Sequence, residues 1–207
     1  MESERRFAKK IEIRKLRRMN FLKRLIFGAV LLCLGSVLSW TGPVSPAQGD
    51  ADMTTGTLKI ESSAFREGGM IPKLYTCDGA DLSPSLSWGA IPPGAKSLAL
   101  IVDDPDAPAK TWVHWVVFDL PADSGGLPES VPADPTLASG ARQGINDFQR
   151  IGYGGPCPPG GTHRYFFKLY ALDTRLELDP GSSKSQLLSA MEGHILAEGQ
   201  LMGRYAR

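Results

Sequence analysis

A loop rich in glycine and proline, followed closely by a histidine and a tyrosine, is the segment of this chain best suited to chemistry. Proline fixes the backbone and glycine permits unusual angles, so such a loop has a definite shape. It also exposes N–H groups that could surround a small anion. No Gly-Lys-Ser/Thr sequence follows it, which distinguishes it from a nucleotide-binding loop. The residues concerned are Gly154, Gly155, Pro156, Pro158, His163 and Tyr165.

His163 and Tyr165 begin an apolar and aromatic run that continues to Leu172 and predicts a β-strand. Residues two apart on a strand share a face, so both side chains would point the same way, beside the loop. A ring that can donate a proton and a phenol next to this loop indicate a site for a polar, anionic group. The same pattern also suits a packed turn and a core strand, with His163 hydrogen-bonded structurally.

Two aspartates form a second candidate cluster. Asp104 and Asp106 lie in the sequence DPDAP, at the end of the apolar run 97–103, which predicts a strand. The two prolines predict a rigid loop at this point rather than the start of a helix. Aspartate before proline is common in turns, so this cluster also has a purely structural interpretation.

His114 is the third candidate and lies in the sequence WVHWVVFDL, residues 112–120. This β-branched and aromatic run predicts a central strand, on which His114 would share a face with Trp112, Val116 and Phe118. Two histidines, two aspartates and a tyrosine from three separate segments could line one cavity. Taken singly, a histidine on an apolar face is more often a hydrogen-bonded core residue than a ligand-binding residue.

The remaining segments complete a mostly β architecture with a helix against the sheet. Residues 57–63 alternate apolar and polar and predict a strand, whereas residues 65–88 are too broken by Gly, Pro and Asp for a helix. Residues 121–143 predict a long surface loop, either a lid or an insertion. A Ser-Lys-Ser-Gln capping box predicts a helix over residues 184–199, with His194 in a structural role.

The N-terminal part of the chain differs in composition from the rest. Residues 1–24 are basic and predict a cytoplasmic segment, and residues 25–40 are apolar and uncharged, as in a signal peptide or a membrane anchor. Residues 41–56 predict a linker, with a plausible cleavage after Ala47, and residues 57–207 predict one domain. We therefore expect an exported protein, periplasmic or secreted, or membrane-anchored if the leader is uncleaved.

Charge is divided between these two parts. Ten Lys or Arg against three Glu give the first forty residues a net charge of +7, and thirteen basic against nineteen acidic residues give the remainder −6. An acidic domain argues against a nucleic-acid partner. The basic segment could itself be a nucleic-acid-binding arm, but the apolar run directly after it favours contact with a membrane.

Three cysteines are present, and one of them, Cys33, lies in the apolar leader. Cys77 and Cys157 remain in the predicted domain, an even pair in what would be an oxidising compartment. A disulfide between them is one hypothesis. Two small buried thiols are the alternative.

The sequences DPDAP, WVHWVVFDLP and GYGGPCPPGGTHRYFFKLYALD, taken together, resemble the phosphatidylethanolamine-binding protein family. They are most similar to its bacterial branch, often described as Raf-kinase-inhibitor-like, and the resemblance covers about residues 57–207. It implies a large antiparallel sheet packed on a smaller sheet, with few helices and a small anion pocket at one end. By motif, Asp104, Asp106 and His114 would belong to the rim, the loop 154–158 would form a wall, and His163 with Tyr165 would line the pocket.

The resemblance implies non-catalytic binding of phosphate-like anions or phospholipid head groups, with no cofactor, and an unknown protein partner is conceivable. Imidazole N–H, tyrosine O–H and backbone N–H groups suit phosphate oxygens, and the aspartates could stabilise charged histidine or meet an ethanolamine ammonium. Inhibition of a kinase or protease through protein contact is an alternative. A metal-dependent hydrolase using His114, His163 and Asp104 is another, although no familiar helical ligand motif is present.

Overall fold

The structure is a computed structural model that describes residues 56–207. The predicted segments 1–24 and 25–40, and all of the linker 41–56 except Gly56, lie outside the described residues. Within residues 56–207, no helix is long and apolar enough to cross a membrane. The expectations about the leader therefore stay predictions.

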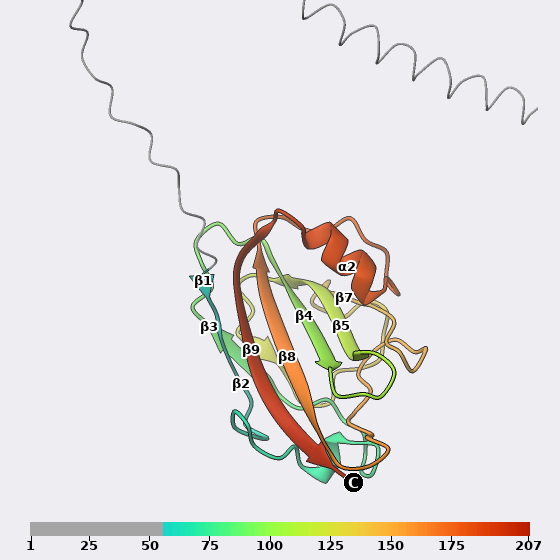
Figure 1. Cartoon of the computed structure of the whole chain (residues 1–207). Helices are drawn as coiled ribbons and strands as arrows, with labels where there is room; N and C mark the ends of the chain where they lie inside the picture. The colour runs from blue at the N-terminus through green and yellow to red at the C-terminus, as the bar shows by residue number, and fades with distance from the viewer. Residues whose placement is uncertain (1–55) are drawn as a thin grey trace, which may run out of the picture. The chain divides into compact units, whose positions relative to one another are not determined.

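Two β-sheets form the domain (Figure 1). The larger has six strands in the order β1-β9-β8-β4-β5-β7, and the smaller has three in the order β2-β3-β6. The strands of the large sheet are β1 (Gly56–Thr57), β4 (Ser97–Asp104), β5 (Trp112–Pro121), β7 (Arg142–Gln143), β8 (Thr162–Leu172) and β9 (Ile195–Ala206). Those of the small sheet are β2 (Lys59–Glu61), β3 (Leu86–Gly89) and β6 (Gly126–Leu127).

This architecture confirms the prediction of a mostly β fold with a large and a small sheet. The large sheet is mixed rather than wholly antiparallel, because β1 pairs with β9 in the parallel direction. The other pairings of both sheets are antiparallel. The predicted strand 57–63 is split between β1 and β2, so one short run serves both sheets.

The main core lies between the sheets and is built by alternation along the strands. Leu98, Leu100 and Val102 on β4 point towards the small sheet, and Ala99 and Ile101 point to the other face. A second cluster on that other face includes Leu187 and Met191 of α2 (Lys184–Met191). The large sheet is thus covered on both faces, which explains why β4 is a continuous apolar run.

The predicted helix begins correctly but ends eight residues early. Ser183 caps it, and its hydroxyl and the Gln186 side chain complete the capping box. The helix ends at Met191, and Gly193 adopts a φ of 78° that turns the chain back. Residues from Ile195 onward join β9 because they pair with β8. The placement of His194 on the helix was therefore wrong, since it lies in the turn after it.

Two short elements fall within segments predicted as irregular. The region 65–88 holds a single 3-10 turn, η1 (Lys73–Tyr75), and the start of β3. The region 121–143 contains β6 and ends in β7, so it is less of a free loop than its composition indicated. Its middle, residues 128–140, is nevertheless largely exposed.

Candidate functional site

A small cavity of about 190 Å³ lies where the first residues of β5 and β8 meet the last of β4. It brings together four of the predicted site residues, which come from separate segments of the chain. These are Asp104, His114, Pro158 and His163. The residues 121–143 contribute nothing to its lining, so that region is not its lid.

His114 reaches the cavity through a β-bulge. Val102 pairs with Trp115 and the next residue, Asp103, pairs with Val113, so His114 is the extra residue on β5. The expectation that His114 shares a face with Val116 and Phe118 was wrong for this reason. The bulge turns its ring towards Tyr165, with ring centroids 5.2 Å apart. Bulges commonly redirect a side chain next to a functional site.

The ring of His114 is held by the glycine loop. Its Nδ1 lies 2.6 Å from the carbonyl oxygen of Gly154, and the Gly154 N–H donates to the His114 carbonyl at 2.9 Å. A side chain at Gly154 would collide with the ring of Phe148, which requires glycine there. Because the Gly154 oxygen can only accept, Nδ1 carries the proton, and Nε2 is the atom left to meet a ligand.

Burial lowers the pKa of His114 below its ordinary value. The Gly154 carbonyl and the negative charge of Asp104 oppose this effect but are smaller. The ring is only 3% exposed, so its charged form is poorly solvated in the absence of a ligand. An anion in the cavity would restore favourable interactions to that charged form.

His163 forms a buried pair with Asp104. Its Nδ1 lies 2.7 Å from Oδ2 of Asp104, and both residues are less than a tenth exposed. The carboxylate accepts from Nδ1–H, so Nε2 of His163 is the nitrogen that remains for a ligand. Asp104 also accepts, through Oδ1, the backbone N–H of Asp106 at 2.8 Å. This turn orients the carboxylate towards the histidine.

Tyr165 lies behind the cavity wall rather than in it. Its ring packs edge-on against His114, and it is 1% exposed. Burial, with Asp104 nearby, raises the pKa of its phenol well above the ordinary value. Its hydroxyl has no hydrogen-bond partner among the residues that the structure describes. The shared face with His163 is as expected from the strand pattern.

Three other predicted residues lie away from the lining. Asp106 turns outward to Arg164, with Oδ1 2.7 Å from Nη2 of the guanidinium. The N–H of Gly155 donates to Asp81 at 2.7 Å, and the carbonyl of Pro156 accepts from the N–H of Cys77 at 3.1 Å. The N–H groups of Gly154 and Gly155, two of the donors expected to surround an anion, therefore already have partners within the protein.

Sequence reasoning missed most of the apolar lining. The indole of Trp112 and the ring of Phe148 pack edge to face, with centroids 5.4 Å apart, and form one side of the cavity. Phe148 also packs against His114. The nearby DPDAP and CPP sequences complete the wall with Ala107, Pro108, Cys157 and Pro159. Among the aromatic lining residues, the sequence pattern indicated only Trp112, which was expected to share a face with His114.

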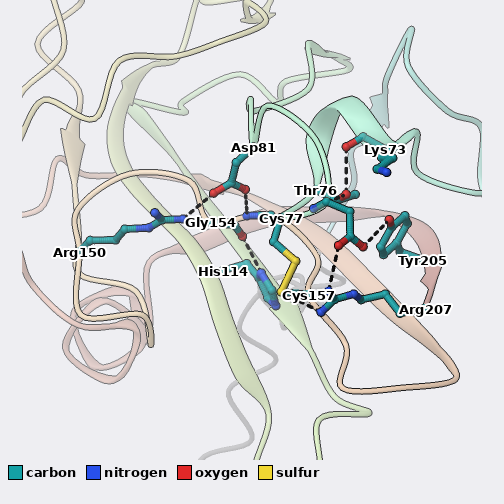
Figure 2. Close-up of a disulfide and its surroundings, with 12 residues drawn as sticks. Lys73, Thr76, Cys77, Asp81, His114, Arg150, Gly154, Cys157, Tyr205 and Arg207 are labelled. Atoms are coloured by element: carbon teal, nitrogen blue, oxygen red, sulfur yellow. Dashed lines mark hydrogen bonds and ion pairs between the residues drawn. A yellow bond between two sulfur atoms is a disulfide. The ribbon is translucent and has the colours of Figure 1, made fainter.

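Cys77 and Cys157 form a disulfide that closes 80 residues of chain, with their Cα atoms 5.4 Å apart. Figure 2 shows it beside His114 and Gly154. Since Cys157 itself lines the cavity, the disulfide is part of the wall. No group of three or more potential metal ligands occurs among residues 56–207.

The site is thus a small, histidine-lined cavity at one end of a two-sheet β domain. The chain belongs to the phosphatidylethanolamine-binding protein family, whose model matches residues 61–206. This confirms the resemblance seen in the sequence. Family membership supports binding of a ligand or a protein as the general function.

Relatives with similar sequences include two proteins named UPF0098. One from Methanothermobacter thermautotrophicus is 57% identical over 150 residues, covering 72% of this chain and 99% of the relative. One from Aquifex aeolicus is 50% identical over 153 residues, covering 72% of this chain and 89% of the relative.

Two solved structures are similar to the domain. A Chlamydia trachomatis homologue of phosphatidylethanolamine-binding protein, CT736, superposes with a TM-score of 0.68 at 43% identity, covering 74% of this chain and 99% of its own. Escherichia coli YbcL, described as a new member of the mammalian family, has a TM-score of 0.69 at 34% identity, covering 73% and 99%.

Proposed function

We propose that the cavity binds a small phosphate-like anion, free or as the head group of a phospholipid, without catalysing its conversion. The observation that carries this proposal is the placement of two histidines around one cavity. The Nδ1 atoms of His114 and His163 are held by Gly154 and Asp104, at 2.6 and 2.7 Å. Each ring therefore has its Nε2 atom left for a ligand in the same small space.

The protonation states open to the two histidine rings suit the binding of a phosphate group. When charged, each Nε2–H donates to a phosphate oxygen, and charge-assisted bonds of this kind are the stronger ones. When neutral, His114 presents a lone pair that accepts from a protonated phosphate. A phosphate monoester loses its second proton at a pKa of about 6, so either route requires one shared proton. Binding should weaken as the pH rises and that proton is lost.

Among phosphate-like ligands, Asp104 should favour those that carry a cation next to the phosphate. A carboxylate beside a bound phosphate is unfavourable unless a cation lies between them, and His163 is placed to be that cation. An ethanolamine ammonium would supply a second one. The cavity of about 190 Å³ suits a head group rather than a whole lipid. The disulfide is compatible with export to an oxidising compartment.

The test is calorimetric titration of the full-length chain with inorganic phosphate and with phosphoethanolamine. We expect saturable binding that His163→Ala reduces at least about tenfold, the loss expected for a charge-assisted hydrogen bond. His194→Ala is the matched control, because His194 forms a similar pair with Asp173, at 2.8 Å, but is exposed. The control should bind like the unmodified protein.

Absence of saturable binding by the unmodified, folded chain would overturn the proposal. A family function through contact with a protein partner would then be favoured. Equal losses in both histidine variants would also count against it, because they would show that the effect does not come from the cavity.

A further inference from the structure

We propose that the Cys77–Cys157 disulfide is a redox switch that sets the affinity of the cavity for its anion. This inference rests on the proposed function, because it concerns the same cavity. Cys157 and the two prolines that follow it line the cavity. The other half of the disulfide comes from a segment 80 residues away. Any change in this bond therefore acts directly on the cavity wall.

The wall segment 157–160 depends on the disulfide for its position. Backbone hydrogen bonds hold the chain on either side, from Cys77 N–H to the Pro156 carbonyl at 3.1 Å and between Gly161 and Arg207 at 3.1 and 3.3 Å. Among the described residues, no backbone hydrogen bond holds the segment between them. Pro158 and Pro159 have no N–H to offer. Within residues 56–207, the segment has one polar contact besides the disulfide, at 3.6 Å from Arg207 to the sulfur of Cys157.

The segment around Cys77, at the other end of the disulfide, is itself held in place by side-chain contacts. The carboxylate of Asp78 accepts a hydrogen bond from the Tyr205 hydroxyl at 2.8 Å and pairs with Arg207 at 3.0 Å. Figure 2 shows these contacts on the side of the disulfide facing the end of β9. Through Asp78, the disulfide therefore joins the cavity wall to the end of β9, rather than to another loop without such contacts.

The disulfide is open to chemical attack. Cys77 is exposed and Cys157 is half-buried, so a dithiol reductant can reach the sulfur of Cys77. Its thiolate attacks that sulfur, the S–S bond breaks, and Cys157 leaves as a thiolate beside the Arg207 guanidinium. The second thiol of the reductant then displaces Cys77. Overall, the protein gains two electrons and two protons, and the dithiol becomes a disulfide.

Reduction should loosen one wall without disturbing the histidines. His114 is held by Gly154, and His163 by Asp104, through bonds that do not involve the disulfide. The freed segment 157–160 would have to be ordered again when an anion binds, and this ordering costs affinity. We expect reduced protein to bind phosphate about tenfold more weakly, the loss expected for ordering one or two extra groups.

The experiment uses the full-length chain carrying Cys33→Ser, which leaves only the pair in question. Phosphate titrations compare the oxidised protein, the same protein reduced with dithiothreitol, and protein reoxidised after reduction. Mass spectrometry counts the two protons gained, and near-ultraviolet circular dichroism checks that the reduced protein stays folded. The expected result is weaker binding on reduction, recovery on reoxidation, and no response to dithiothreitol in Cys77→Ser, which should bind like reduced protein.

Each of the other outcomes would overturn either the redox switch or the anion site. Equal affinity in the folded oxidised and reduced forms would overturn the switch and leave the anion site standing. Failure of the oxidised protein to bind would instead refute the anion site itself. Absence of the mass change, or unfolding on reduction, would also overturn the switch, because the disulfide would then be absent or purely structural.

Discussion

Two neighbouring aspartates at the end of β4 have opposite surroundings. Asp103 is fully buried on the face covered by α2, where its carboxylate lies 3.0 Å from Nζ of Lys168 and 2.5 Å from Nζ of Lys184. Asp104 is also buried, but on the other face, where it pairs with His163 at the edge of the cavity. One peptide bond thus separates a packed charge cluster from a candidate ligand site.

The partners of these aspartates explain the difference in role. Two ammonium groups contact the Asp103 carboxylate, so this carboxylate is already engaged within the protein. Histidine is the residue type whose charge ordinarily changes near neutrality, and the Asp104 pair borders open space rather than core. A buried carboxylate therefore indicates function only when its partner and its surroundings can both change.

The largest effect is expected from a substitution of Asp103, and it concerns the stability of the folded protein. Asp103→Asn would leave two half-buried ammonium groups, those of Lys168 and Lys184, facing each other without a counter-charge. We expect the free energy of unfolding to fall by about 3 kcal/mol, the lower end of the range for removing one partner of a buried ion pair, because the two lysines keep some contact with solvent. Urea unfolding at neutral pH measures this, with the exposed Asp123→Asn as control. A loss below about 1 kcal/mol would show that the cluster is no more than a surface pair.

The corresponding change at Asp104 should act mainly on binding. Asp104→Asn keeps an acceptor for His163 but removes the negative charge that lies 2.7 Å from its Nδ1 atom. We expect phosphate affinity to fall about tenfold and the free energy of unfolding by about 1–3 kcal/mol. Calorimetry and urea unfolding of the same preparation separate the two effects. Tighter phosphate binding by the variant would show that the carboxylate repels the anion.

The pH dependence of His114 sharpens the contrast further. Because burial lowers its pKa, the folded protein holds this proton less tightly than the unfolded chain. Its contribution to stability is present above the ordinary histidine pKa of about 6.5 and is lost as the pH falls towards the lowered value. Phosphate affinity should rise over the same range, since the anion favours the charged ring. Thermal unfolding and titration between about pH 5 and pH 8 measure both.

His114→Asn should flatten both of these pH profiles. A stability profile identical to that of the unmodified protein would show that His114 is not the group responsible. Phosphate affinity that stayed constant with pH in the unmodified protein would contradict the shared proton in the proposed site.

The smallest effect is expected at Asp106, which is close to the cavity in sequence but paired with Arg164. That guanidinium lowers the pKa of Asp106 to about 2, mainly through its hydrogen bonds. The contribution of the pair is present above the ordinary aspartate pKa and lost as the pH falls towards about 2. Because the pair is exposed, Asp106→Asn should shift the melting temperature by only about 1 °C.

Phosphate affinity of Asp106→Asn should stay within about twofold of the unmodified value, as for other exposed substitutions. Calorimetry beside Asp104→Asn makes the comparison direct. A loss as large as that of Asp104→Asn would return Asp106 to the candidate site, in agreement with the original expectation from the DPDAP sequence.

Local sequence was enough to predict the strands β4, β5 and β8 and the start of the helix, but not the strand β9. The runs 97–103, 112–120 and 163–172 each differ from the observed strand by no more than one residue at either end, because β-branched and aromatic side chains on a buried sheet leave little choice. The capping box did the same for the beginning of α2. The helix end was missed because pairing of β9 with β8 is a long-range interaction that outweighs a local apolar period.

The candidate site could be predicted only in part from local sequence. His163 and Tyr165 were placed correctly on one face, because a regular strand has a fixed period of two. His114 was misplaced because a β-bulge breaks that period, and the bulge depends on the partner strand β4. The lining by Phe148 was also missed, because it comes from a loop whose position depends on contacts outside it.

By itself, the sequence determined the strands β4, β5 and β8, which residues carry titratable groups, and that two cysteines remain in the domain. Tertiary structure alone decided that Asp104 pairs with His163 while Asp103 meets two lysines and Asp106 meets Arg164. The physical reason is that alternation along a strand assigns neighbouring side chains to opposite faces. What each of them then meets depends on strand register and on segments distant in the chain.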